Sequence, residues 1–249
     1  MQATDSCCED PPPLAAGRRL AISQSNYIPW KGYFDLIASV DRFVVYDSVQ
    51  FTKNDWRNRN LIKTQAGPQW LSIPVGSDIH RRICDVELPA SPWRQKHWKS
   101  IAAAYARAPF FAEVSAWLAP IYAQAQDTRL SAFNVRLMRA VCAYLGIGTE
   151  IVVHDGVHRE QDRVMKLVEI CQRHGAGVYV SAPAGRQYID PAVFARHGLA
   201  LEWFDYAGYP SYPQLHGPFV HQVSVLDALF HCGPHRDRFL RRVAVPAPV

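Results

Sequence analysis

Short apolar runs that alternate with helix-patterned segments are the feature that most limits how this chain can fold. Buried strands are expected at residues 20–22 and 43–46, and between them apolar residues recur at helical spacing over 29–39. Pro29 suits the first turn of that helix because its φ is already near the helical value. The pattern predicts one βαβ unit, and the continuous apolar run at 43–46 is typical of a parallel strand that is covered on both faces.

The same alternation returns from residue 150 onward, after a hairpin and a run of helices. Two strands at 56–62 and 69–75, separated by a turn-rich stretch, indicate a hairpin. Further strands are expected at 150–153, 178–181 and 199–204, and helices at 93–107, 110–125, 128–145, 162–174, 191–197 and 223–231. The predicted fold class is α/β: a mostly parallel, Rossmann-like sheet with a hairpin after the second strand and a helical insertion.

One domain over residues 19–236 is expected, with the helical segment at 93–145 and a C-terminal tail at 237–249. Residues 1–18 contain three consecutive prolines and no apolar core of a signal peptide, so a disordered tail is predicted there. No run of about 18 apolar residues occurs, which argues against a membrane span.

The six cysteines are scattered and show no zinc-site spacing, so no metal is expected. Cys142 and Cys171 fall on apolar helix faces and are interpreted as core residues. Reduced thiols favour a cytoplasmic location.

Ligands of parallel sheets bind beyond the carboxyl ends of the strands, so the segments that follow each strand form the candidate site. These segments are 23–27, 47–51, 154–155, 181–186 and 205–209. They are rich in amides, hydroxyls and guanidiniums, and forked guanidiniums suit carboxylate or phosphate. The predicted substrate-binding residues are Gln24, Asn26, Tyr27, Trp30, Gln50, Lys53, Arg57, Asn58, Arg59, Asn60, Arg163, Ser181, Arg186 and Tyr188.

Asp47 and His97 are the catalytic candidates. Asp47 ends a strand, where a ligand role is favoured over packing. His97 shares a helical stripe with Trp93 and Ile101, so a buried, hydrogen-bonded state is expected, although a general base needs a residue of this tunable kind. Asp162 is interpreted as a helix N-cap.

The segment 53–63 carries four cations and one anion in a chain of net charge +5. An anionic partner would be attracted to it. The alternative is a solvated loop, because runs of charge usually face water.

Several motifs occur together in this chain. They are Ile22-Ser23-Gln24-Ser25-Asn26-Tyr27-Ile28-Pro29-Trp30, Phe43-Val44-Val45-Tyr46-Asp47-Ser48-Val49-Gln50-Phe51, Asn58-Arg59-Asn60-Leu61-Ile62-Lys63-Thr64, His97-Trp98-Lys99, Asp162-Arg163, Gly185-Arg186-Gln187-Tyr188, Tyr212-Pro213-Gln214 and Ser224-Val225-Leu226-Asp227. Together they resemble the WbqC-like family, and the resemblance extends from about residue 19 to residue 233. The family commonly has a histidine before the first glutamine or a proline after it, whereas this chain has Ser23 and Ser25, so no histidine role carries over. The resemblance implies that a protein of this kind is encoded beside the genes for surface polysaccharides and natural products. It implies no particular reaction.

A second likeness concerns layout. A strand, a polar loop, a helix, a second strand and then Gln50-Phe51 are similar in order to pantothenate synthetase, where a Gln-Phe pair helps to hold an acid that becomes an adenylate. The phosphate-stabilising histidines of those enzymes are absent here, with Trp30-Lys31-Gly32-Tyr33 in their place, which argues against ATP chemistry.

These observations lead to two hypotheses. The first is a biosynthetic enzyme that transfers or activates an acyl or aminoacyl group and forms an amide on an amino-sugar or natural-product precursor. Its donor would be an adenylate made with ATP or an acyl thioester on a carrier protein, and direct aminolysis is favoured because no nucleophilic cysteine is evident. The second is a non-catalytic protein that binds a nucleotide-sugar or a nucleic acid. Nucleic acid is the less favoured ligand, because most aromatic rings are expected to be buried.

Overall fold

The computed structural model describes residues 17–241, and these pack as two compact units. Of the described residues, the sheet unit contains 17–23, 40–46 and 150–205, and the helical unit contains 24–39, 47–149 and 206–241. The chain therefore leaves the sheet unit directly after three of its strands. The prediction of a single domain over 19–236 stays a prediction.

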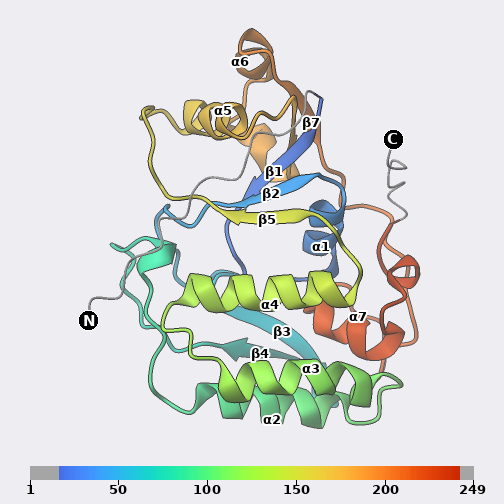
Figure 1. Ribbon diagram of the computed structural model, residues 1–249. Helices are drawn as coiled ribbons and strands as arrows, with labels where there is room; N and C mark the ends of the chain where they lie inside the picture. The colour runs from blue at the N-terminus through green and yellow to red at the C-terminus, as the bar shows by residue number, and fades with distance from the viewer. Residues whose placement is uncertain (1–16, 242–249) are drawn as a thin grey trace. The chain divides into compact units, whose positions relative to one another are not determined.

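The sheet unit contains a five-stranded, wholly parallel sheet with the order β5-β2-β1-β6-β7 (Figure 1). The strands are β1 (Arg19–Ser23), β2 (Arg42–Val45), β5 (Glu150–Val153), β6 (Val178–Ser181) and β7 (Ala200–Trp203). Helix α5 (Arg163–Arg173) connects β5 to β6, and a 3-10 turn (Pro183–Gln187) and α6 (Pro191–Arg196) connect β6 to β7. The predicted α/β, Rossmann-like class is confirmed.

The central strands are buried because both of their faces are covered. Every residue of β2 is buried, which explains its continuous apolar run Phe43-Val44-Val45. Arg42 is the one charged residue of this strand. Its guanidinium is buried and lies 2.6 Å from the half-exposed Glu150 carboxylate on the neighbouring strand. Cys171 of α5 is fully buried, as predicted.

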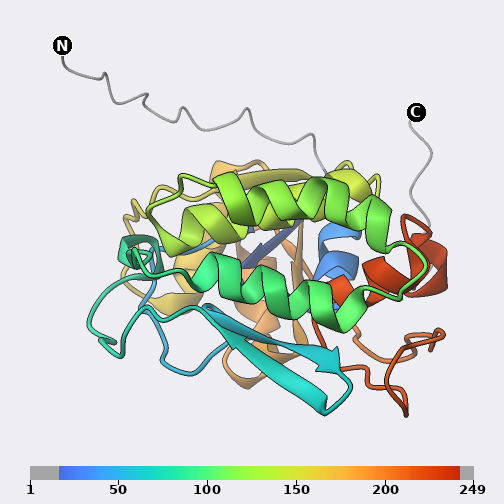
Figure 2. The same cartoon turned by 90° about the horizontal axis from the view of Figure 1, so that it is seen from below.

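The helical unit contains an antiparallel hairpin and five α-helices. The hairpin pairs β3 (Arg59–Thr64) with β4 (Gly67–Ser72). The helices are α1 (Lys31–Ala38), α2 (Trp93–Tyr105), α3 (Phe111–Gln124), α4 (Leu130–Tyr144) and α7 (Val225–Cys232). Two further 3-10 turns occupy Ile83–Asp85 and Arg236–Arg238. Figure 2 shows α2 and α3 beside the hairpin, and the predicted core position of Cys142 on α4 is confirmed.

Strand β3 begins three residues later than the sequence pattern predicts. Residues 56–58 form a turn instead, because the Asp55 carboxylate accepts a hydrogen bond from the Trp56 N–H and the Arg57 side chain bonds to Gln24. The strand pattern at 56–58 is therefore overridden by side-chain contacts within the helical unit.

Most of the predicted N-terminal tail, 1–18, lies outside the described residues, and so does 242–249 of the predicted C-terminal tail. Residues 237–241 are described, and Phe239 and Leu240 are buried. Among residues 17–241 no helix is long and apolar enough to span a membrane.

Replacing the cap residue of α5 should destabilise the sheet unit. The Asp162 carboxylate accepts 2.9 Å hydrogen bonds from the N–H groups of Val164 and Met165, which confirms the predicted cap. Asp162→Ala should cost about 1 kcal/mol in urea unfolding, whereas Asp162→Asn should cost only a few tenths. Equal losses in both variants would mean that the hydrogen bonds to the helix terminus contribute nothing.

Candidate functional site

A cavity of about 570 Å³ in the helical unit has mainly aromatic walls. We call it the aromatic pocket, and it is lined by Asn26, Pro29, Trp30, Trp56, Asn60, Tyr206, Gly208, Tyr209, His221 and Gln222. This size and a largely apolar wall with a few polar groups are typical of small-molecule sites. Three of its lining residues that the sequence singled out, Asn26, Trp30 and Asn60, come from the loop before α1 and from β3.

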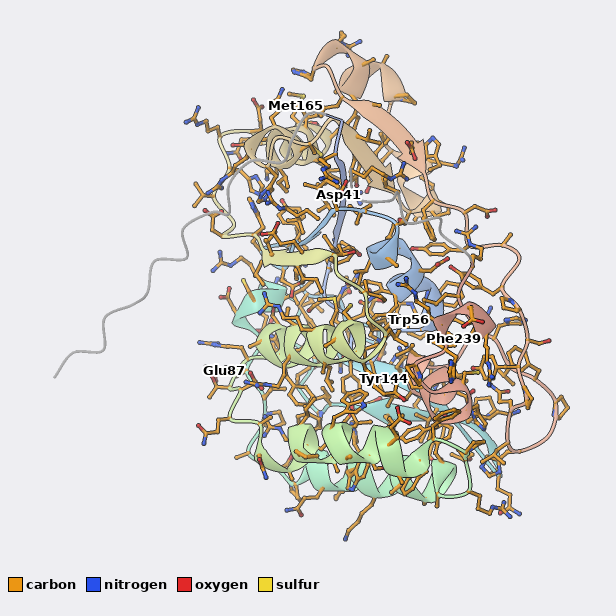
Figure 3. The ribbon with its side chains drawn as sticks, turned by 45° about the vertical axis from the view of Figure 1, so that its right-hand side comes forward. Asp41, Trp56, Glu87, Tyr144, Met165 and Phe239 are labelled. Atoms are coloured by element: carbon orange, nitrogen blue, oxygen red, sulfur yellow. The ribbon has the colours of Figure 1, made fainter. Side chains whose placement is uncertain are left out.

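The wall of the pocket is a cluster of three rings. The Trp30 ring centroid lies 5.3 Å from that of Tyr206 and 5.4 Å from that of Tyr209. The indole of Trp30 folds over Gly32, where a methyl group would overlap it, so a glycine is required at this place in α1. Trp56 lines the pocket, and 45% of its surface is exposed. Its position is labelled in Figure 3.

Arg57 connects two of the predicted binding residues. Its guanidinium donates to the Asn26 side-chain oxygen and, at 3.0 Å, to that of Gln24. Asp55 lies 3.9 Å away. Because the Asn26 oxygen is already engaged by Arg57, its NH₂ group is the part that can meet a ligand.

Asn60 braces the loop that precedes α1. Its NH₂ group donates to the backbone carbonyls of Tyr27 and Ile28, at 3.1 and 2.9 Å. Ile28 has a φ of +38°, a conformation that is strained for a β-branched residue. The side chain of Asn60 thus satisfies two carbonyls at a strained turn, and its main role is to shape the pocket.

Asp47 is the centre of a buried polar cluster that holds the same loop. One carboxylate oxygen accepts a 2.7 Å hydrogen bond from the Ser25 N–H, and the other accepts from the Ser131 hydroxyl. Asn134 donates to the Ser25 hydroxyl and, at 2.9 Å, to the carbonyl of Arg57. Asp47 is 1% exposed and is absent from the pocket wall, so in this geometry it positions the loop.

Lys31 at the start of α1 is 2% exposed. Its ammonium donates to the Pro210 carbonyl at 2.9 Å and lies within 5.5 Å of the ring centroids of Tyr209, Tyr212 and Phe219. Burial lowers the pKa of this amine to about 8, while the Cys232 and Asp227 side chains partly offset the shift. The aromatic cage stabilises the cation by cation–π contacts.

His221 was not predicted from the sequence, because its loop has no periodic pattern. It lines the pocket, and its ring packs edge-on against Phe219 with centroids 4.6 Å apart. Partial burial, together with the charge of Lys31, lowers its pKa below the ordinary value of 6.5. An exposed, neutral imidazole at this position can accept a proton near pH 7.

His97, the predicted base, lies in the core in the buried, hydrogen-bonded state that its helical stripe predicts. Its Nδ1 is 2.7 Å from the Tyr27 hydroxyl, which is also 2.7 Å from that of Tyr122. Burial lowers the pKa of His97 to about 4. Tyr27 is fully buried in the same cluster, so its side chain supports the loop from inside.

The remaining predicted residues of the helical unit lie at the start of the hairpin and in the segment before it. Gln50 is exposed and donates to the Ile79 carbonyl, and Lys53 is also exposed. Asn58 donates to the Ile73 carbonyl at 2.9 Å. The Arg59 guanidinium lies 4.3 Å from the Trp70 ring centroid.

Four predicted binding residues belong to the sheet unit. Arg163 stacks on the Tyr188 ring at 3.5 Å, and Arg186 lies 4.8 Å from the Trp203 ring centroid. Ser181 is buried at the end of β6. A single cleft that joins these residues with those of the helical unit stays a prediction.

The histidines that follow β5 form a close pair. The Nε2 atoms of His154 and His158 are 3.2 Å apart, and both rings pack edge-on against Tyr46. Across residues 17–241 no group of three or more His, Cys, Asp or Glu side chains is arranged to hold a metal ion.

The fold and this site define an α/β protein whose pocket is shaped by buried polar side chains. The model of the WbqC-like protein family matches residues 24–239, and the chain belongs to this family. It is 45% identical over 226 residues to the uncharacterized protein Rv1507c of Mycobacterium tuberculosis (strain ATCC 25618 / H37Rv), a match that covers 90% of this chain and 98% of the relative. No solved structure is significantly similar to the chain.

Removing the Asn60 side chain should destabilise the helical unit. Asn60→Ala leaves the carbonyls of Tyr27 and Ile28 without their donor, and a cost of about 2–3 kcal/mol in denaturant unfolding is expected. The matched control is Asn58→Ala, which removes one hydrogen bond from a half-buried side chain and should cost about 1 kcal/mol. A loss no larger than that of the control would contradict the role of Asn60 as a brace.

Acid should weaken the fold through His97. Its folded pKa of about 4 lies below its unfolded value of 6.5, so the unfolded chain binds a proton first as the pH falls. The free energy of unfolding should therefore drop between pH 6.5 and 4, with a contribution from this residue of up to about 1.4 kcal/mol per pH unit. His97→Gln should flatten that slope, while His80→Gln, at an exposed position, should leave it unchanged. A slope that is identical in all three proteins would show that His97 does not contribute to the loss of stability in acid.

Proposed function

We propose that this chain is a cytoplasmic biosynthetic enzyme that forms an amide by transferring an acyl or aminoacyl group to an amine on a sugar or natural-product precursor. The observation that carries the proposal is His221 in the aromatic pocket, where an imidazole with a lowered pKa lies among aromatic walls and amide groups. The family resemblance supports an amine-bearing precursor of this class, since it implies polysaccharide and natural-product genes.

In the proposed reaction the amine nitrogen attacks the carbonyl carbon of an activated acyl donor. His221 removes the proton that the nitrogen must lose. The C–N bond forms, and the thiolate of a thioester donor or the AMP of an adenylate donor leaves the acyl carbon with its electron pair. The amide groups of Asn26 and Gln222 line the same pocket and can donate to the oxygen that gains negative charge. The products are the amide and the released thiol or AMP.

Direct aminolysis fits the thiols of the described residues better than an acyl-enzyme does. Burial raises the pKa of Cys142 to about 12 and that of Cys232 to about 11, so both stay protonated near pH 7. Among the described residues, no cysteine lines the aromatic pocket. A thiol that is both buried and protonated is a poor nucleophile.

Replacing His221 should slow turnover without unfolding the protein. With acyl thioesters and a panel of amino-sugars, amide formation followed by mass spectrometry should fall about 10²–10³-fold in His221→Gln. His235→Gln, at an exposed position in the same C-terminal segment, should keep the wild-type rate. Pyrophosphate release from ATP and a carboxylic acid would identify an adenylate donor, and the absence of amide from both donor classes would overturn the proposal.

A non-catalytic binding protein is the second candidate, and it is favoured by two exposed tryptophans, Trp56 and Trp70, beside Arg59. A thermal-shift screen separates the two candidates, because a ligand that binds the folded state raises its melting temperature. Nucleic-acid binding should weaken steeply with salt. Stabilisation by a small ligand at every salt concentration would dismiss nucleic acid.

A further inference from the structure

Two of the seven tryptophans stand exposed and in contact with each other. Trp56 and Trp70 are 45% and 43% exposed, and their ring centroids are 5.6 Å apart at an interplanar angle of 36°. The other five tryptophans are buried or half-buried. Large indoles left in water at one place indicate a binding surface, because burying them would otherwise stabilise the fold.

The strand pattern of the hairpin explains why this pair faces outward. Trp70 of β4 pairs with Leu61 of β3, and side chains alternate between the two faces, so Asn60 and Leu71 turn inward while Trp70 and Arg59 share the outer face. The Arg59 guanidinium stacks 4.3 Å from the Trp70 ring centroid and donates to the Asn54 carbonyl. Its Nε is buried and has no hydrogen-bond partner among the described residues.

This tryptophan platform, formed by Trp56, Trp70 and Arg59, continues into the aromatic pocket. Trp56 belongs to both, since it stacks with Trp70 and also lines the pocket. A ligand that occupied the two together would be an elongated molecule with a planar ring at its outer end.

The charge at the platform favours a short anion over a polyanion. Lys53 is exposed in the turn that precedes β3, and Arg59 is half-buried on the outer face of the hairpin. Asp55 is engaged by the Thr52 hydroxyl and the Trp56 N–H. Lys63, which the sequence would count as part of a basic track, is buried and donates to Gln214 and to the carbonyls of Gly217 and Pro218. One exposed and one half-buried cation near the paired indoles suit a nucleoside diphosphate, whereas a nucleic-acid backbone would need a longer basic surface.

We propose that Trp56, Trp70 and Arg59 bind the nucleoside diphosphate part of a sugar-nucleotide, whose sugar enters the aromatic pocket. The base stacks on the indoles, and the diphosphate lies between Arg59 and Lys53. The placement of the sugar in the aromatic pocket rests on the proposed function, because there the amine of that sugar accepts the acyl group.

The test is calorimetric titration of the full chain with uridine diphosphate, without any acyl donor. Trp70→Ala should weaken binding about tenfold, as the loss of one stacking face predicts, and Trp70→Phe should recover most of it. Arg59→Gln should also weaken binding and reduce the slope of affinity against salt by about one ion. The matched controls are Gln69→Ala, which is exposed on the same strand, and Arg107→Gln, which changes the net charge by the same amount elsewhere.

Three outcomes would overturn the platform: equal affinity in Trp70→Ala and the wild type, pyrophosphate that binds as tightly as uridine diphosphate, or a thymidine decanucleotide that binds more tightly than thymidine diphosphate. The binding measurement does not depend on catalysis, so a failure of amide formation would leave it standing. Conversely, if the protein formed amides on a free amino-sugar but did not bind uridine diphosphate, the proposed binding at the platform would be wrong and the proposed function would stand.

Discussion

The carboxylate of Asp47 is buried with 1% exposure, and the loop in front of α1 depends on its two hydrogen bonds. An isolated carboxylate is costly to bury, so the fold must supply donors from both sides. The Ser25 N–H comes from the loop, and the Ser131 hydroxyl comes from α4. This arrangement attaches a segment without regular structure to a helix more than 100 positions away in the chain. The positions of Asn26 and Trp30 at the pocket depend on that attachment.

Asn60 and Asn134 extend this constraint from the loop to the hairpin. Asn60 satisfies the carbonyls on either side of the strained Ile28, while Asn134 joins Ser25 to the backbone of Arg57. Because these side chains satisfy the carbonyls of Tyr27, Ile28 and Arg57, they hold the loop in the conformation in which Asn26 and Trp30 line the pocket. The aromatic rings then supply the apolar walls, and Lys31 and His221 supply the charge and the proton acceptor near them.

Local patterns predicted the elements well, because their causes are local. Apolar periodicity predicted each strand of the parallel sheet, and the carboxylate of Asp162 predicted the start of α5. The motifs also pointed to Asn26 and Asn60 at the pocket. The hairpin boundary was different, since Arg57 is held by Gln24 and Asn26, and such a contact has no local signature. For the same reason the sequence offered no sign of His221.

By itself, the sequence determined the fold class, the family and the concentration of polar residues in the loops after the strands. Those properties follow from periodicity and from motifs, which are readable along the chain. Only the tertiary structure decided that Lys63 is buried rather than part of a basic surface, and that Trp56 and Trp70 lie together at the surface. Each of these depends on which distant groups meet a side chain, because burial and hydrogen bonding are set by neighbours in space.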